Sequence, residues 1–196
     1  MQKVIIRLLD IIISLVALIL LSPVFVVVCV MIFFDLGHSI FFVQQRLGQD
    51  RKLFKMIKFR SMRDVELDAS QHHETVNKYA IKLKNDPRIT PFGAFIRKTS
   101  LDELPQLFNV LSGKMSLVGP RPWVPEEYTQ FPEQWFSRLN TKPGITGLAQ
   151  INGRSDLAMP EVIKLDNEWE RRYSVMFYWQ ILFRTVAKIV QGHNTY

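Results

Sequence analysis

An apolar run from Ile11 to Phe34 sets the first limit on the fold, because its 24 residues carry no formal charge. A straight helix of that length would extend about 36 Å, enough to cross the roughly 30 Å hydrocarbon layer of a bilayer. Ser22 and Pro23 lie at its centre, where the proline removes one backbone hydrogen bond and can divide the run into two halves too short to span. A kinked spanning helix is the alternative, since prolines are tolerated in spans whose neighbours re-satisfy the backbone.

Positive charge lies on both sides of this run. Lys3 and Arg7 precede it, and a basic segment from Arg46 to Arg63 follows, with seven Lys or Arg against the single acid Asp50. Near an anionic leaflet each such cation contributes on the order of 1 kcal/mol of attraction. Cations at both ends favour no crossing and are compatible with both ends in the cytoplasm. The residues alone therefore leave a hairpin and a span equally open.

The bulk properties indicate a single domain with polyanionic partners. The chain has 196 residues, which is long enough for one hydrophobic core. Its formal net charge of +7 at pH 7 suits nucleic acid, anionic lipid or diphosphate substrates. The sequence has no recognisable nucleic-acid reading motif, so we expect no nucleic-acid partner. The single cysteine, Cys29, provides no disulfide framework.

Two adjacent carboxylates, Asp102 and Glu103, stand where a helix is predicted to begin. Ser100 is a suitable N-cap, Glu103 is its capping-box partner, and apolar residues recur at helical spacing after it. As the second residue of that helix Asp102 would be ionised, because free backbone N–H groups and the helix dipole favour negative charge. An ionised carboxylate is a nucleophile toward phosphorus or a ligand for Mg²⁺. An ordinary helix cap is the alternative interpretation.

Other segments predict short elements and candidate phosphate contacts. Pro120 and Pro122 fix the backbone around Arg121, which suits a phosphate clamp, although rigidity alone is the alternative. Arg154 follows a glycine-containing turn and is a further candidate. An apolar stripe on the last predicted helix suits either core packing or a membrane interface, and it consists of Trp179, Leu182, Phe183, Val186 and Val190. The predicted elements are a strand within 39–48, a helix from Phe92 to Thr99 that carries Arg97, a helix from Glu126 to Leu139 interrupted at Pro132, a strand from Leu148 to Ile151, and two helices between Pro160 and Val190.

Three blocks of sequence resemble the signature blocks of the bacterial sugar transferases. They are KFRSM at Lys58 to Met62, RKTSLDELPQLFNVLSGKMSLVGPRP at Arg97 to Pro122, and KPGITGLAQINGRS at Lys142 to Ser155. More narrowly, the chain resembles the small monotopic phosphoglycosyl transferases, which load the first phospho-sugar onto a polyprenyl phosphate carrier. In that group a Ser-Pro break lies in a re-entrant helix that enters and leaves the same leaflet.

The resemblance implies a two-step reaction. Asp102 would attack the β-phosphate of a UDP-sugar and release UMP, and polyprenyl phosphate would then take the phospho-sugar from the aspartate. Mg²⁺ is the implied cofactor, with Asp102 and Glu103 as candidate ligands whose roles are not separated by the sequence. The candidate contacts to substrate phosphates are Lys58, Arg60, Arg97, Arg121 and Arg154. Downstream glycosyltransferases are candidate partners.

The sequence thus predicts an α+β protein at the bacterial inner membrane. Residues 1–36 form a re-entrant membrane helix hairpin, and residues 37–196 form a small, helix-rich catalytic domain with short strands and interfacial helices on the cytoplasmic face. A rival of another class is a non-catalytic membrane scaffold with a basic lipid-binding face, which would bind anionic liposomes without releasing nucleotide. An Asp-x-Asp glycosyltransferase is disfavoured, because that triplet does not occur in the chain.

Overall fold

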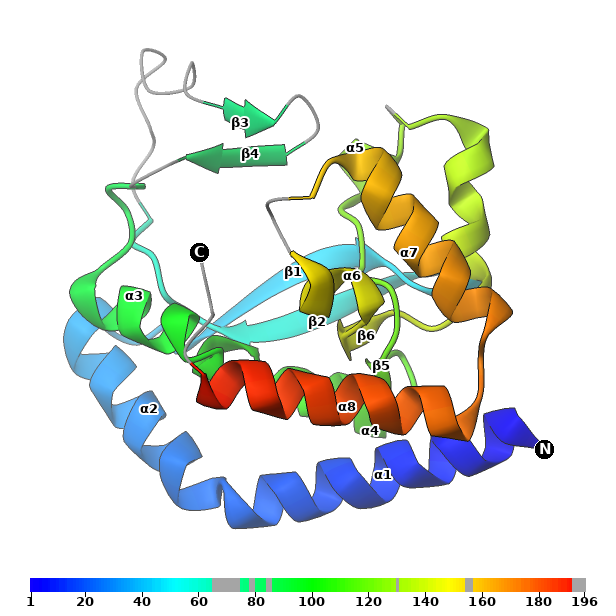
Figure 1. Cartoon of the computed structure of the whole chain (residues 1–196). Coiled ribbons are helices and arrows are strands. Elements are labelled where there is room, and N and C mark those ends of the chain that lie inside the picture. Colours follow the sequence, from blue (N-terminus) through cyan, green and yellow to red (C-terminus); the bar gives the residue numbers. More distant parts are fainter. Residues whose placement is uncertain (65–74, 78–79, 84–85, 130, 154–156, 192–196) are drawn as a thin grey trace.

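The computed structural model describes residues 1–64, 75–77, 80–83, 86–129, 131–153 and 157–191, which mix helices with short strands (Figure 1). The helices are α1 (Gln2–Leu20), α2 (Ser22–Leu36), α3 (Pro91–Lys98), α4 (Gln106–Leu111), α5 (Pro125–Tyr128), α6 (Leu148–Asn152), α7 (Met159–Arg171) and α8 (Val175–Val190), with 3-10 turns at Gln49–Arg51, Leu101–Glu103 and Glu133–Asn140. The strands are β1 (Phe41–Leu47), β2 (Leu53–Phe59), β3 (Thr75–Asn77), β4 (Ala80–Leu83), β5 (Ser116–Val118) and β6 (Gly144–Thr146).

The apolar N-terminal run is broken at the predicted dipeptide. Helix α1 ends at Leu20 and α2 begins at Ser22, with Pro23 in its first turn, and the two helices are bent by 63° (Figure 1). Ser22 Oγ donates to the carbonyl oxygen of Ile19 at 2.8 Å, which gives one carbonyl at the break a partner. Among the described residues neither helix is long and apolar enough to cross a bilayer alone, whereas the bent pair together has the length and composition to do so.

A buried carboxylate fastens α1 to the rest of the molecule. Asp10 Oδ1 accepts three hydrogen bonds, from the Ser116 hydroxyl at 3.0 Å, the Leu117 amide at 2.9 Å and the Tyr178 hydroxyl at 2.9 Å. These donors come from β5 and α8, so one side chain joins three elements that are far apart in the sequence. Three hydrogen bonds to one buried oxygen make this a firm attachment of the first half-helix.

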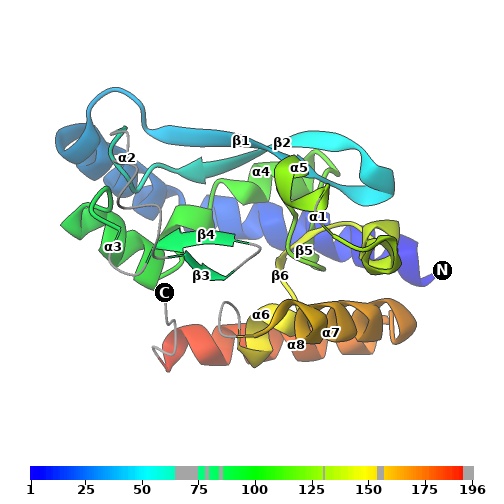
Figure 2. The same cartoon turned by 90° about the horizontal axis from the view of Figure 1, so that it is seen from above.

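The remaining strands pair in twos. Strands β1 and β2 form an antiparallel hairpin from Phe41 opposite Phe59 to Leu47 opposite Leu53, which confirms the strand predicted within 39–48. Strands β3 and β4 are also antiparallel, whereas β5 and β6 run parallel. Viewed from above, the hairpin lies on the side of the molecule opposite α7 and α8 (Figure 2).

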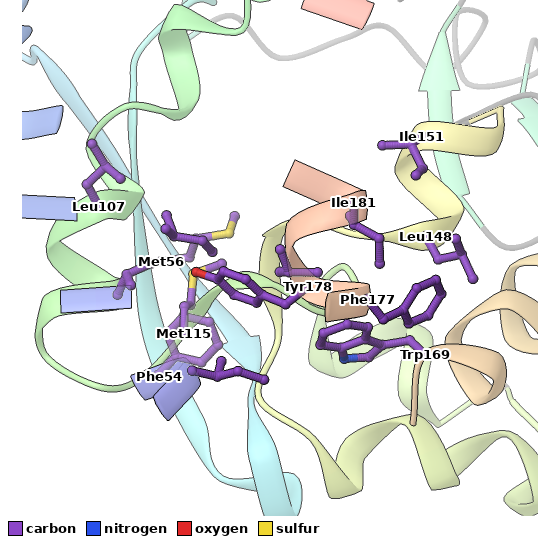
Figure 3. Packing of buried hydrophobic residues seen from close by; sticks show 14 residues of the cluster. Phe54, Met56, Leu107, Met115, Leu148, Ile151, Trp169, Phe177, Tyr178 and Ile181 are labelled. Carbon is purple, nitrogen blue, oxygen red and sulfur yellow. The ribbon is translucent and has the colours of Figure 1, made fainter. Parts of the chain in front are cut away.

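The main core joins the elements that carry the candidate site. Tyr178 of α8 lies between Met56 and Met115 on one side and Trp169 of α7 on the other, and Ile181 of α8 lies on the Trp169 side (Figure 3). Burying a large apolar side chain stabilises a fold by about 1.5–3 kcal/mol, so this cluster fixes β2, α4 and β5 relative to one another. Its buried members are Ile6, Phe54, Met56, Leu107, Val110, Met115, Leu117, Val118, Leu148, Ile151, Trp169, Phe177, Tyr178 and Ile181.

Of the other predicted elements, the strand at Leu148 to Ile151 was wrong and the helices were confirmed in whole or in part. The segment Leu148–Asn152 is helix α6 rather than a strand, because a short apolar run has no period that separates the two, and the strand is the preceding Gly144–Thr146. The helix predicted from Glu126 to Leu139 with an interruption at Pro132 is confirmed in part, as the four-residue helix α5 before the proline and a 3-10 helix that begins after it. The predicted helix at 92–99 and the two helices between 160 and 190 are confirmed as α3, α7 and α8.

Candidate active site

The candidate site lies where β2, α3 and the loop after β5 meet the 3-10 turn that holds the two carboxylates. Strand β2 brings Lys58, the end of α3 brings Arg97, and the loop after β5 brings Arg121. All three cations influence Asp102 electrostatically. The tertiary structure therefore brings Lys58 of the first signature block to Arg97, the two carboxylates and Arg121 of the second.

The predicted capping box at Ser100 is wrong. Ser100 has a left-handed backbone, with φ 58° and ψ 17°, and its hydroxyl makes no cap hydrogen bond. The chain closes a 3-10 turn over Leu101–Glu103, in which the amide of Glu103 donates to the carbonyl oxygen of Ser100 at 3.2 Å, and α4 begins only at Gln106. Pro105 has no N–H to donate, so a regular helix from Ser100 through this point would lack a bond. Burial and neighbouring charges, rather than a helix dipole, set the ionisation of Asp102.

Glu103 is held by two cations. Its Oε1 lies 2.9 Å from Lys58 Nζ and 3.4 Å from an Arg121 guanidinium nitrogen. Burial opposes the ionised carboxylate, but Lys58 and Arg121 outweigh that effect and lower the pKa of Glu103. Burial also lowers the pKa of Lys58, while the charge of Glu103 acts in the opposite direction. The two groups therefore form a mutually dependent ion pair.

Asp102 is in a different state from its neighbour. It is 6% exposed, and its Oδ1 is enclosed without a hydrogen-bond partner among the described residues. Burial, followed by the charge of Glu103, raises its pKa to about 6, whereas Lys58, Arg97 and Arg121 act in the opposite direction. The carboxylate is thus mostly ionised at neutral pH and poorly solvated, which is the condition of an activated nucleophile. The structure distinguishes two carboxylates that the sequence could not separate.

The dyad also fits part of a Mg²⁺ site. Mg²⁺ commonly binds through one or two carboxylates together with substrate phosphates and water. The unpartnered Oδ1 of Asp102 is a hard oxygen donor of the required kind. Within the described ranges no cluster of three or more His, Cys, Asp or Glu could hold a metal ion, so the phosphates of a substrate would have to complete the coordination.

The Arg121 loop is held rigidly by neighbouring elements. The Arg138 guanidinium donates to the carbonyl oxygen of Arg121 at 2.6 Å, and Arg46 donates to that of Pro122 at 3.2 Å. The amide of Leu47 donates to the carbonyl oxygen of Trp123 at 2.9 Å. These contacts, together with the prolines, fix the backbone position from which the Arg121 side chain extends.

Two other predicted phosphate contacts are placed differently. Arg60 forms an ion pair with Asp64, and its Nε donates to the carbonyl oxygen of Met62 at 3.2 Å. Those contacts direct it along its own segment, and the described structure gives it no contact with the dyad. Arg154 lies outside the described residues. Both remain predictions.

Sequence reasoning missed Asn109 and Arg138. Asn109 Nδ2 donates to the carbonyl oxygen of Lys55 at 2.7 Å and its Oδ1 accepts from the amide of Ile57 at 3.0 Å, so the side chain joins α4 to the edge of β2. The sequence feature that could have identified Asn109 is its position as a polar residue inside the apolar run of α4. Arg138 is 2% exposed, lies 3.0 Å from Asp166 and stacks over Trp123, and its sequence gave no comparable signal.

Asn109→Asp is expected to lower the free energy of unfolding by roughly 2–4 kcal/mol, because the new carboxylate repels the carbonyl oxygen of Lys55 and loses the Nδ2 donor. For a protein of this size that corresponds to a Tm lower by about 5–15 °C, measured by scanning calorimetry. The matched control is Gln45→Glu, the same amide-to-carboxylate change at an exposed residue of β1, which should melt close to wild type. Equal melting temperatures for the two variants would contradict the role of the Asn109 clamp.

Comparison with known proteins gives extended matches. A family model described as bacterial sugar transferase matches residues 1–192. Exopolysaccharide production protein ExoY of Rhizobium meliloti (strain 1021) is 36% identical over 194 residues, which are 95% of this chain and 86% of that protein. Undecaprenyl-phosphate galactose phosphotransferase of Salmonella typhimurium is 41% identical over 97% of this chain and 41% of its own length. UDP-glucose:undecaprenyl-phosphate glucose-1-phosphate transferase of Escherichia coli (strain K12) is 42% identical over 91% of this chain and 39% of its own length.

Proposed function

Since this chain belongs to the bacterial sugar transferase family and is a transferase of phosphate-containing groups, we propose that it moves a sugar-1-phosphate from a UDP-sugar to polyprenyl (undecaprenyl) phosphate. The reaction would be the first membrane step in assembly of a bacterial surface glycan. The names of the Salmonella and Escherichia relatives support the carrier, and the Escherichia name supports a UDP-sugar donor. The observation that carries the proposal is a buried carboxylate with an unpartnered oxygen, surrounded by three cations at Lys58, Arg97 and Arg121.

The proposed chemistry proceeds through a covalent intermediate. An oxygen of the Asp102 carboxylate attacks the β-phosphorus of the UDP-sugar, an O–P bond forms, and the bond to the leaving oxygen of UMP breaks. A phosphate oxygen of polyprenyl phosphate then attacks the same phosphorus and releases Asp102. The products are UMP and polyprenyl diphosphate sugar. Covalent catalysis of this kind replaces one difficult step with two easier ones.

The other residues have separate tasks. Arg121 and Lys58 provide positive charge beside the attacking carboxylate, and Glu103 holds both of them in place. Arg97 adds a third positive charge near Asp102. Asp102 and Glu103 would hold Mg²⁺ together with the diphosphate, and the ion would neutralise charge on the phosphates and the leaving group.

The exposed apolar side chains support membrane attachment. Large hydrophobic residues are exposed in numbers on α1, α2 and α8, whereas an ordinary surface exposes such side chains singly. We propose that α1 and α2 form a re-entrant hairpin and that α8 lies in the interface of the same leaflet. The side chains include Leu8, Ile12, Leu15 and Ile19 of α1, Val26, Val27, Val30 and Phe34 of α2, and Met176, Phe183, Val186 and Ile189 of α8.

The apolar stripe on α8 is divided between the two interpretations made from the sequence, core packing and a membrane interface. Phe183 and Val186 are 67% and 59% exposed, so core packing was the wrong interpretation for them. Trp179 and Leu182 are partly buried against the main core, as core packing predicted. The helix thus turns one face to the core and leaves another free for the proposed interface.

UMP release tests the proposed function. The solubilised protein is supplied with Mg²⁺, polyprenyl phosphate and a panel of UDP-sugars, and UMP is quantified. Release with one UDP-sugar supports the transferase reaction and identifies the donor. We expect EDTA to abolish release and added Mg²⁺ to restore it. A protein that binds anionic liposomes and releases no UMP with any UDP-sugar would instead support the scaffold.

Lys58→Met is expected to reduce UMP release by about 10–100-fold. Without the ammonium, the buried Glu103 carboxylate keeps only the longer contact to Arg121, its pKa rises, and the charge beside Asp102 is lost. Lys55→Met is the matched control, because Lys55 lies on the same strand and is exposed. Equal rates for the two variants would exclude Lys58 from the site.

The re-entrant topology predicts that both ends of the hairpin are cytoplasmic. Lys3→Cys and Lys52→Cys, each combined with Cys29→Ser, are treated with a membrane-impermeant maleimide. Both cysteines should react in inverted vesicles and neither in intact spheroplasts, since Lys3 lies in the first turn of α1 and Lys52 lies beyond the end of α2. Labelling of position 3 in spheroplasts would show that the pair spans the membrane.

A further inference from the structure

Ser100 combines two unfavourable features directly before the carboxylate dyad. Its φ of 58° lies in the left-handed region, which is costly for a residue with a Cβ and is readily adopted by glycine or asparagine. Among the described residues, the other non-glycine residues with positive φ are Asp50 and Arg51. Both lie at the exposed end of the β1–β2 hairpin. Ser100 instead connects α3 to the turn that holds Asp102.

The Ser100 hydroxyl makes no contribution to that turn. The backbone already closes it, since the amide of Ser100 donates to the carbonyl oxygen of Arg97 at 3.1 Å and its carbonyl oxygen accepts from Glu103. The hydroxyl oxygen is enclosed and has no hydrogen-bond partner within the described part of the chain. Leaving a buried polar group unsatisfied is unfavourable, and such groups in native proteins call for an explanation. Glycine would relieve both the backbone strain and the unsatisfied hydroxyl, so stability does not account for serine.

A second polar atom without a hydrogen-bond partner lies two residues further along the chain. Asp102 Oδ1 is also enclosed and unpartnered among the described residues. One group is a hydroxyl that can donate a hydrogen bond, and the other is a carboxylate oxygen that can only accept one. Two unsatisfied groups of opposite kind in one turn suggest that they act together when the site is occupied.

We propose that Ser100 is a positioning residue for the nucleophile. In the substrate-loaded site its hydroxyl rotates and donates to Oδ1 of Asp102, which fixes the carboxylate plane and leaves Oδ2 directed at phosphorus. A carboxylate oxygen has two acceptor sites, so this hydrogen bond leaves one on Oδ1 free. The inference rests on the proposed function, because the hydroxyl acts only through Asp102. Orientation of a nucleophile changes the rate of the chemical step and leaves ground-state binding of the donor largely unaltered.

The test separates the hydroxyl from the backbone conformation. Ser100→Gly and Ser100→Ala both remove the hydroxyl, and only the first also relieves the left-handed strain. We expect both to lower the kcat of UMP release by about 10–100-fold with KM for the UDP-sugar within about twofold of wild type, while neither melts below wild type. Ser100→Thr keeps the hydroxyl on a β-branched residue, so it should melt lower and yet retain a higher kcat than Ser100→Gly.

The control is a second strained residue that lies outside the candidate site. Asp50→Gly relieves the same kind of backbone strain on the exposed hairpin end and should leave kcat unchanged. Wild-type kcat in Ser100→Gly, or rates that follow melting temperature across the three Ser100 variants, would overturn the positioning role alone. A wild-type protein that releases no UMP with any UDP-sugar would overturn the proposed function and this inference with it.

Discussion

Replacing Asp102 with asparagine is expected to reduce UMP release by at least about 10³-fold. The carboxamide has almost the shape of the carboxylate but is too weak a nucleophile to form the bond to phosphorus. The fold should survive, because Oδ1 makes no hydrogen bond within the described residues and the raised pKa of about 6 shows that burial disfavours the charged form. We therefore expect Asp102→Asn to melt at or above the temperature of wild type.

The covalent step can be observed directly. When the wild-type protein receives a UDP-sugar and Mg²⁺ without polyprenyl phosphate, its intact mass should rise by one phospho-sugar, and that of Asp102→Asn should not. Asp50→Asn is the control, since it makes the same change at an exposed position. Release by Asp102→Asn at the wild-type rate, or a phospho-sugar adduct on that variant, would exclude Asp102 as the nucleophile.

Gly119→Ala is expected to lower the free energy of unfolding by about 3 kcal/mol or more. A Cβ at this position would lie inside the van der Waals contact distance of the Lys142 carbonyl oxygen and 2.9 Å from the Gly144 amide nitrogen, and both are backbone atoms of the opposing segment. To make room, β5 and β6 would separate and weaken the hydrogen bond from the Gly119 amide to Thr146 at 2.8 Å. The adjoining Arg121 loop would move with them, so UMP release should fall as well.

Calorimetry checks this prediction, with an expected Tm lower by about 6–12 °C. Gly37→Ala serves as the control, because Gly37 has φ 80° and open space around the added Cβ, so it reports backbone strain without a clash. That strain should cost about 1–3 kcal/mol, because φ 80° with ψ −153° lies in a region that essentially only glycine adopts. A Gly119→Ala protein that melts no lower than Gly37→Ala would show that the two strands can separate at little cost.

The successful sequence predictions depended on local chemistry. Pro23 cannot donate a backbone hydrogen bond, so the break between α1 and α2 could be located from the residues alone. The unsuccessful ones concerned segments where local preference is weak. Ser100 satisfies the pattern of a capping box, but the turn around it is closed by backbone contacts with Arg97 and Glu103, and the hydroxyl is left unused. Leu148 to Ile151 gave no periodicity that could separate a strand from a short helix.

The sequence by itself identified the family and the candidate carboxylates Asp102 and Glu103, because both can be recognised from contiguous blocks of residues. Only the tertiary structure decided how the two carboxylates differ. Lys58 is 45 positions from Glu103 in the chain, and its ion pair forms where β2 packs beside the dyad, a placement to which core packing and the Asn109 hydrogen bonds both contribute. Asp102 is left without such a partner in the same described region. The strength of an ion pair and the cost of burial depend on distances and solvent access that packing creates, so no local pattern could assign them.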